Sequence, residues 1–479
     1  MRSLEDTTPQ LFGHPRGLAY LAFTEAWERF SFQGMQALLV LYMVDRLLQP
    51  GHIEHIAGFG AFRSIVEGLY GPLATQPLSS VIYGLYTSLI FLAPVFGGVL
   101  ADRLFRQHRL VMLGAILMAC GHFAMAFEAP FLIALLLLIV GCGCLKGNIA
   151  TQLGSLYADV DRRRTEAFQI FSICTNIGVI VAPLVCGTLG ELYGWHYGFG
   201  AAGIGMLIGL CIYVAGQKHL PPDRMRALRS CTRRRDACTR SNALPGSVER
   251  DGPTPPYDRR LLLVLALVFV LVSCFLVTGG QLGNVYNLWL KANVNRHIFG
   301  NTVIPITWFQ SITSIGTVTV TPLILQLWQR QAKRAREPAL LSKMGVGLAA
   351  ASLALLWLAA VSYLSATTGP VYWLWLLPVH LLLSVGYIFV YPVGLALFSR
   401  VARPSERATF MGIFFVTSFV ASNVIGWGGR FYQTMSPPSF WLMQAYVGAG
   451  GVLLILLLGR PLGRVLEATE HPGSKIGGS

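Results

Sequence analysis

The chain alternates between long apolar segments and short polar ones. Each apolar segment is long enough to cross about 30 Å of hydrocarbon as an α-helix. A helix in lipid also satisfies its own backbone hydrogen bonds, so helices are the expected elements. The predicted spans are residues 18–48, 80–104, 109–128, 131–157, 163–190, 196–217, 260–291, 303–331, 341–364, 370–401, 405–433 and 438–464. This pattern predicts an all-α membrane protein with about twelve transmembrane helices.

The loops between these spans alternate in charge. Basic loops follow the even-numbered spans, as in ADRLFRQHRL after the second span and QRQAKRAREP after the eighth. The opposite loops 129–130, 191–195 and 365–369 contain no Lys or Arg. Because Lys and Arg concentrate in cytoplasmic loops, we expect the even-numbered loops and both termini to be cytoplasmic. Residues 49–79 are then the longest outside loop, with room for a short interfacial helix.

One cytoplasmic segment is longer and more basic than the others. Residues 218–259 contain the run CTRRRDACTR and several prolines, a composition typical of a solvated linker. The linker separates residues 1–217 from residues 260–479, and each half contains six of the predicted spans. Two such halves match the major facilitator architecture, in which the binding site lies at the bilayer midplane between them.

Composition narrows the possible functions. Hydrophobic residues make up 54% of the 479 residues and charged residues only 12%, whereas a soluble domain carries roughly twice that charged fraction. The net charge is +15, but the basic residues lie in loops between apolar spans, so we expect no nucleic-acid partner. The chain lacks zinc-ligand spacing, a nucleophile elbow and a phosphate-binding loop, so we expect neither an enzyme nor a metal protein.

Three charged residues lie inside the first apolar span. Glu25, Glu28 and Arg29 follow the spacing i, i+3, i+4, which places them on one side of a helix. Each charge at membrane depth costs several kcal/mol unless it is paired or hydrated. A helix end at the interface is disfavoured, because about ten residues of the span lie on either side. We therefore expect these side chains to face a cavity or one another.

Other polar residues in the spans allow two interpretations each. Lys146 follows a long apolar run, and we prefer a buried lysine that pairs with a carboxylate of span one. The alternative is a lysine that snorkels from a helix end. Asn176 could bridge two helices or face a site, and Tyr86 could place its hydroxyl in a cavity or be an ordinary packed aromatic residue.

Several motifs resemble those of one family. EAWERFSFQGM resembles the E-x-x-E-R-F motif of the proton-dependent oligopeptide transporters, and GCGCLKGN resembles that family's span-four lysine motif. AFQIFSICTNIG resembles a second family signature, and weaker matches extend through GQLGNVYNLW, TWFQSIT and GYIFVYPVGLALFSR. GGVLADRLFRQHR resembles the G-x-x-x-D-R signature of major facilitators, in which Asp102 would cap a helix and Arg103 would help to latch the halves. The resemblance covers nearly the whole chain.

This resemblance implies a function and a set of site residues. It implies a proton-coupled symporter that imports small peptides or their derivatives across the bacterial inner membrane by alternating access. Protons would be the coupling ion with no other cofactor, and the partners would be a small peptide and the lipid bilayer. Proton coupling would involve Glu25, Glu28, Arg29 and Lys146. The implied substrate positions are Arg29, Gln33, Gln36, Tyr86, Lys146, Asn176, Gly280, Thr313 and Tyr387.

Several of these positions depart from the family pattern. Gln36 replaces an arginine, whereas Gly280 and Tyr387 replace glutamates. The Gln36 and Gly280 positions pair with each other in the family, so both partners are missing together. With Tyr387 in place of an acid, Lys146 would depend on span one for a partner. Two alternative functions remain, namely transport of another carboxylate-bearing solute and a non-transporting, peptide-sensing receptor. The retained span-one charges favour transport.

Overall fold

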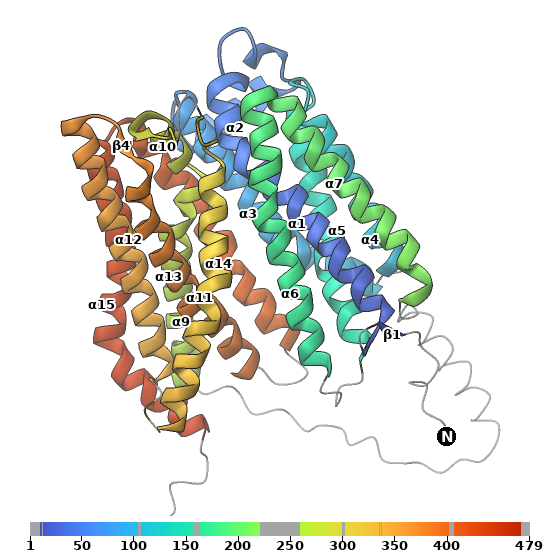
Figure 1. Ribbon diagram of the computed structural model, residues 1–479, viewed down its shortest axis with the longest axis vertical. Helices are drawn as coiled ribbons and strands as arrows, with labels where there is room; N and C mark the ends of the chain where they lie inside the picture. The colour runs from blue at the N-terminus through green and yellow to red at the C-terminus, as the bar shows by residue number, and fades with distance from the viewer. Residues whose placement is uncertain are drawn as a thin grey trace, which may run out of the picture.

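The protein is a bundle of long helices (Figure 1). The computed structural model describes residues 10–11, 13–103, 107–157, 163–220, 259–298, 302–334, 336, 338–401 and 407–470. The long helices are α1 (Arg16–Tyr42), α3 (Thr75–Arg103), α4 (Gln107–Ala124), α5 (Phe131–Ser155), α6 (Arg163–Ala182), α7 (Trp195–Gly216), α9 (Arg259–Gly280), α11 (Trp308–Lys333), α12 (Leu340–Thr368), α13 (Leu377–Val401), α14 (Arg407–Gly429) and α15 (Pro437–Glu470). These helices correspond to the predicted spans, so the all-α membrane fold is confirmed.

Length and composition alone identify most of these helices as membrane spans. Within the described residues, ten helical segments are long and apolar enough to cross a bilayer. Helix α1 is not among the ten, and it carries Glu25, Glu28 and Arg29 in its middle. Such charges are tolerated inside a bundle where they face one another or a cavity.

Shorter elements connect the long helices. The predicted outside loop contains the 3-10 turn η3 (Ile53–His55) and the amphipathic helix α2 (Phe59–Tyr70), which lies at the upper end of the bundle in Figure 1. Helix α6 continues into the π-helical turns η4 (Pro183–Gly187) and η5 (Leu189–Tyr193). Two small sheets pair β1 (Gln10–Leu11) with β2 (His14–Pro15), and β3 (Val294–Asn295) with β4 (Val371–Tyr372).

The prediction of one continuous span over residues 260–291 was wrong. Helix α9 ends at Gly280, a 3-10 turn covers Gln281–Gly283, and α10 (Tyr286–Asn293) follows. Glycine is a poor helix former, because it loses more backbone entropy than other residues when it becomes ordered. The pair Gly279–Gly280 therefore offers a natural place for the helix to end.

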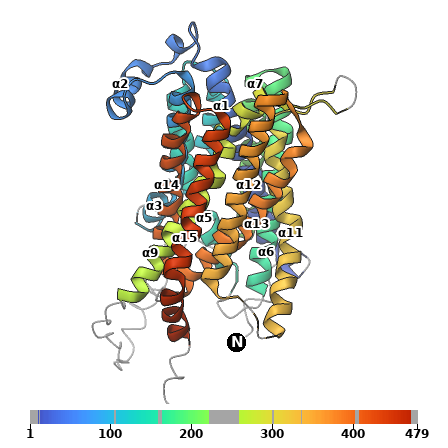
Figure 2. The same ribbon diagram turned by 90° about the vertical axis from the view of Figure 1, so that its left-hand side faces the viewer.

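The buried apolar side chains form two main clusters. One cluster draws almost entirely on residues 18–220 and the other on residues 264–445. Figure 2 shows α3 and α14, one from each part, side by side. Their backbones meet at Gly84 and Gly426, since a Cβ atom added to Gly84 would lie 2.6 Å from the Cα of Gly426. Small residues permit this close crossing. The linker predicted over 218–259 lies outside the described residues except for its ends.

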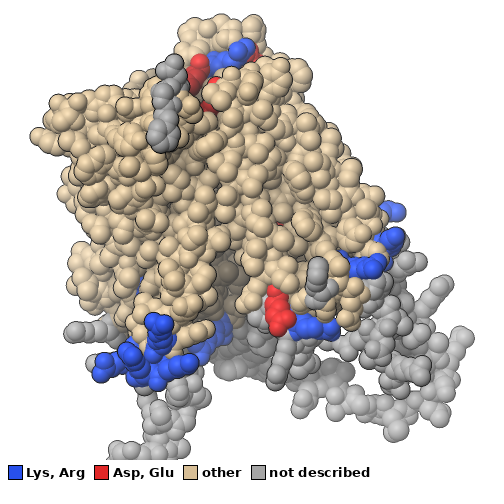
Figure 3. Space-filling model, in the orientation of Figure 1, with Lys and Arg blue, Asp and Glu red and all other residues tan. Residues whose placement is uncertain are grey.

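Polar contacts join the two parts at one end of the bundle. The Lys291 ammonium lies 2.8 Å from the Asp45 carboxylate. Glu191 on η5 accepts hydrogen bonds from the backbone N–H groups of Ile306 and Thr307, at 2.7 and 2.9 Å. All of these contacts lie beyond the C-terminal end of α1 and the N-terminal end of α11. At the opposite end, Figure 3 shows a recess between two lobes, with Lys and Arg side chains gathered along the lower edge.

Candidate functional site

A cavity of about 510 Å³ lies between the two parts of the bundle. This volume falls within the range of about 300–1,000 Å³ that is typical of small-molecule sites. Helices α1 and α6 form one wall, and α9, α11 and α13 form the other. The lining residues are Arg29, Ser172, Thr175, Asn176, Val179, Phe275, Leu276, Gly279, Gly280, Leu282, Thr313, Ser314, Thr317, Leu383 and Tyr387.

The structure brings Glu25, Glu28 and Arg29 together in the α1 wall. Arg29 donates through its Nε and a terminal nitrogen to both carboxylate oxygens of Glu28, and its Nε lies 3.5 Å from Glu25 Oε1. Such two-point pairing is the strong form of an arginine–carboxylate contact. Glu28 is fully buried, and Glu25 is 6% exposed. Among the described residues, Glu25 Oε2 is buried without a hydrogen-bond partner, so this oxygen is free to carry a proton.

Lys146 does not pair with a carboxylate as we expected. Among the described residues, no carboxylate oxygen lies within 4.0 Å of its ammonium group. The Lys146 Nζ instead lies 5.6 Å from the ring centre of Phe32 and 5.4 Å from that of Phe91. Arg29 is the cation that contacts Glu25 and Glu28 in the described structure. Arg29 also lies over Phe32, at 5.1 Å, so two cations flank one aromatic ring.

Five of the predicted substrate positions line the cavity, namely Arg29, Asn176, Gly280, Thr313 and Tyr387. The other predicted positions do not line it. Gln33 donates to Gln310 at 3.5 Å, and Gln36 donates to the Tyr83 hydroxyl at 3.1 Å. These contacts hold both side-chain amides in the packed interior. They lie toward the end of the bundle where polar contacts join the two parts, which we call the closed end.

Two further predictions concern Tyr86 and the end of α3. Tyr86 is 2% exposed, and its hydroxyl is buried without a hydrogen-bond partner in the described part of the chain. Tyr86 is not among the residues that line the cavity. Asp102 and Arg103 are the last residues of α3, and their side chains lie outside the described part of the structure.

The wall formed by α9, α11 and α13 is neutral. The Thr313 hydroxyl lies 2.7 Å from His380 Nδ1, and His380 Nε2 lies 2.9 Å from the Tyr286 hydroxyl. Tyr387 stacks on Tyr391 with ring centres 5.5 Å apart. Sequence analysis missed His380, although a lone histidine in an apolar span was the signal that could have found it.

Gly280 gives the neutral wall its shape. A Cβ atom added at Gly280 would collide with the side chain of Ile425 on α14. The glycine therefore permits α9 and α14 to pack closely at the cavity. Arg29 is the one charged residue among the lining residues given above, so the site presents a cation to a ligand and no acid.

Comparison with known proteins identifies the family. The family model described as the POT family matches residues 108–230 and 254–435. This chain belongs to the POT family. The family predicted from the sequence motifs is therefore confirmed, and membership in a transporter family with many apolar helices makes this a membrane protein.

The match to individual POT relatives extends over nearly the full chain. A di-/tripeptide transporter of Lactococcus lactis subsp. cremoris is 27% identical, with 96% of this chain and 98% of the relative covered. The peptide transporter YePEPT of Yersinia enterocolitica is 29% identical, with 96% of each covered. An uncharacterized transporter of Bacillus subtilis, YclF, is also 29% identical, with 95% of this chain and 96% of the relative covered.

Solved POT structures share the fold. A peptide transporter POT in complex with sulfate superposes with a TM-score of 0.78 at 26% identity, covering 96% of this chain and 98% of that chain. A POT family transporter in complex with 5-aminolevulinic acid has the same TM-score at 22% identity, covering 96% and 100%. The second similarity supports the fold alone.

Proposed function

We propose that this protein is a proton-coupled symporter that imports small peptides or peptide-like carboxylates by alternating access. The observation that carries the proposal is the Glu25–Glu28–Arg29 cluster in the wall of a ligand-sized cavity. The peptide transport named for the Lactococcus and Yersinia relatives supports the same substrate class. Protons are the coupling ion, and the cargo leaves chemically unchanged, so the protein is not an enzyme.

The coupling follows from competition for one guanidinium group. A substrate carboxylate that binds Arg29 competes with Glu25 and Glu28 for the same donors. A buried carboxylate that loses its cation partner tends to take up a proton. Glu25 has the weaker contact, at 3.5 Å, and one oxygen without a hydrogen-bond partner in the described part of the chain, so it is the first to be protonated. Substrate binding and proton binding thereby favour each other.

Alternating access requires the closed end to open. The ion pair between Lys291 and Asp45 and the hydrogen bonds from Thr307 to Glu191 join the two walls there. An opening of this kind resembles rigid rocking of one half against the other. In this structure the recess is at the other end, where the basic side chains gather in Figure 3.

The basic end faces the cytoplasm of a bacterial cell, with both chain termini on the same side of the inner membrane. The linker over 218–259 carries Cys231 and Cys238, which report on this orientation. A membrane-impermeant thiol reagent should label neither cysteine in intact cells and both in inverted vesicles. Labelling in intact cells would contradict the orientation.

The charges of the cavity favour a carboxylate as the main anchor of the substrate. Arg29 offers charge-assisted donors, whereas the opposite wall offers the hydroxyl groups of Thr313 and Tyr387. A peptide ammonium must then be held by neutral acceptors or by water, which bind it less strongly than a carboxylate would. A related solute that has a carboxylate and lacks the free amine fits this site as well.

The test is uptake by purified protein in liposomes with an imposed proton gradient. We expect an inward gradient to drive accumulation of a radiolabelled dipeptide, and an uncoupler to abolish it. Unchanged accumulation in the presence of the uncoupler would contradict proton coupling. Dipeptide binding without any solute-driven proton movement would instead favour the receptor alternative. Recovery of intact dipeptide from the lumen checks that no reaction occurs.

A further inference from the structure

Two histidines and a glutamate meet on the loops at the closed end of the bundle. Suitable ligand atoms of His52, His55 and Glu128 all lie within 4.8 Å of one another. His52 Nδ1 is 2.9 Å from Glu128 Oε1, and His55 Nδ1 is 3.5 Å from Glu128 Oε2. None of the three lines the central cavity, so the transport mechanism does not use this cluster.

The local backbone explains why the two imidazoles face the same way. His52 precedes the 3-10 turn η3, and the N–H of His55 donates to the carbonyl of His52 at 3.0 Å. In a 3-10 turn the side chains at i and i+3 are eclipsed. The spacing His-x-x-His therefore places both rings on one face, as two ligands of one ion require.

A backbone contact brings Glu128 to this face. The N–H of Ala57, just after η3, donates to the carbonyl of Ala129 at 3.0 Å. This bond fixes the η3 loop against the α4–α5 loop beside Glu128. Arg46 donates to Glu128 Oε1 at 3.0 Å, which orients the carboxylate. Hydrogen bonds of this kind from outer groups are typical of carboxylates that bind metals.

The cluster is accessible from outside. The side chains of His52, His55 and Glu128 are 36%, 67% and 19% exposed. Arg46 and Glu128 also line a second cavity of about 380 Å³, which gives an ion a path to the ligands. Three protein ligands leave a coordination position for water, an arrangement common in accessible zinc sites.

We propose that His52, His55 and Glu128 form a binding site for a divalent transition-metal ion, with zinc as the best match. Two imidazole nitrogens and one carboxylate oxygen are ligands that suit zinc, whereas magnesium and calcium prefer oxygen ligands alone. The ion replaces the direct imidazole–carboxylate contacts and ties the η3 loop to the α4–α5 loop. The site belongs to one part of the bundle, so its presence does not depend on the transport cycle.

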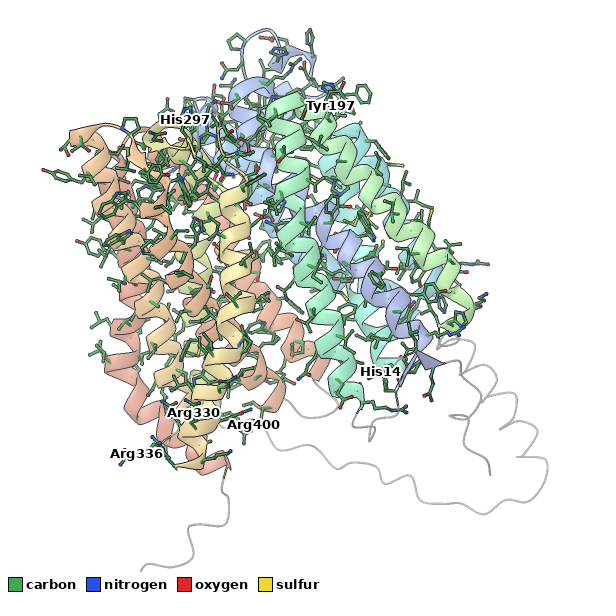
Figure 4. The ribbon with its side chains drawn as sticks, viewed as in Figure 1. His14, Tyr197, His297, Arg330, Arg336 and Arg400 are labelled. Atoms are coloured by element: carbon green, nitrogen blue, oxygen red, sulfur yellow. The ribbon has the colours of Figure 1, made fainter. Side chains whose placement is uncertain are left out.

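The experiment is a zinc titration of the full-length protein, purified without a histidine tag and stripped of metal. We expect one saturable zinc ion per chain by isothermal titration calorimetry. Glu128→Gln and the double variant His52→Ala with His55→Ala should weaken binding by at least about tenfold, the lower range seen when metal sites lose supporting groups. His297→Ala is the matched control, because His297 is an exposed loop histidine at the same end (Figure 4).

Cobalt provides a second measurement that distinguishes this site from cysteine. The chain has nine cysteines, and thiolates also bind zinc. Cobalt in the proposed site should give visible ligand-field bands without the near-ultraviolet charge-transfer band of a thiolate ligand. Size-exclusion chromatography checks that each variant is folded, and His55→Ala alone serves if the double variant is not. Absence of saturable zinc binding, or equal binding by native protein and Glu128→Gln, would overturn the proposal.

Discussion

The two walls of the central cavity differ in how they can hold a substrate. The α1 wall carries Arg29 with Glu25 and Glu28 behind it, whereas the opposite wall carries Thr313 and Tyr387 and no charge among its lining residues. The charged wall can exchange a proton and bind a carboxylate. The neutral wall can shape the cavity and supply neutral hydrogen bonds. Under the proposed function, coupling and selectivity belong to different parts of the bundle, and each proposal can be tested.

The largest effect is expected from Arg29→Met, which removes the cation that pairs with the buried Glu28. Removing one partner of a buried ion pair costs about 3–5 kcal/mol. The variant should unfold at a lower temperature than the native protein. Its dipeptide uptake should be no higher than that of liposomes without protein. Arg330→Met, at the basic end of α11 (Figure 4), is the control and should behave as native. Adding Glu28→Gln should recover part of the lost stability, and native stability of Arg29→Met alone would refute the role of the pair.

Glu25→Gln should separate coupling from binding. This change removes a titrating group but keeps the two-point contact between Arg29 and Glu28. We therefore expect the loss of proton-driven accumulation while downhill counterflow of dipeptide continues. Both activities are measured in the same liposomes. Glu166→Gln is the matched control, because Glu166 is 65% exposed on α6. Normal accumulation by Glu25→Gln would move the coupling role to another residue.

Capped dipeptides compare the two walls directly. Amidation of the C-terminus removes the group expected at Arg29, and a charged hydrogen bond contributes about 1.5–3 kcal/mol. Affinity should therefore fall about tenfold to a hundredfold. N-acetylation removes the ammonium that faces the neutral wall and should have a smaller effect. Competition against one labelled dipeptide measures both. A loss on acetylation as large as that on amidation would show that the neutral wall holds the amine well.

The smallest effect is expected from placing an acid in the neutral wall. Gly280→Glu requires space, because a side chain there collides with Ile425. We therefore combine it with Ile425→Ala. The free dipeptide should then gain affinity several-fold over its N-acetylated form. Gly280→Gln with Ile425→Ala is the uncharged control. If the glutamine and glutamate variants discriminate equally, the missing acid does not determine the preference.

The pattern of apolar and charged residues along the sequence was sufficient to predict most of the fold and part of the candidate site. The helices follow from the length of the apolar segments, because lipid leaves few alternatives to a helix. Glu25 and Arg29 could be placed together because helix geometry relates residues one turn apart. The break after Gly280 was missed, since hydropathy continues across it and only the backbone preference of the glycine pair signals an end.

Contacts between distant segments could not be predicted in this way. The expected ion pair between Lys146 and α1 is absent among the described residues, where Arg29 contacts Glu25 and Glu28 instead. A sequence pattern cannot show which of two cations lies nearer to a carboxylate. The proposed metal site also depends on a contact between segments that are far apart in the sequence. Spacing alone gave no reason to join His52 and His55 to Glu128, which is brought close by a backbone hydrogen bond between two loops.

The sequence by itself therefore determined that this chain is an all-α membrane protein of the POT family with buried charges in its first span. The physical reason is that burial in lipid and the period of a helix act locally along the chain. Only the tertiary structure decided which polar groups meet, which of them reach the cavity, and which wall is neutral. Those outcomes depend on how helices far apart in sequence pack, and on small residues such as Gly84, Gly280 and Gly426 that permit the close approach.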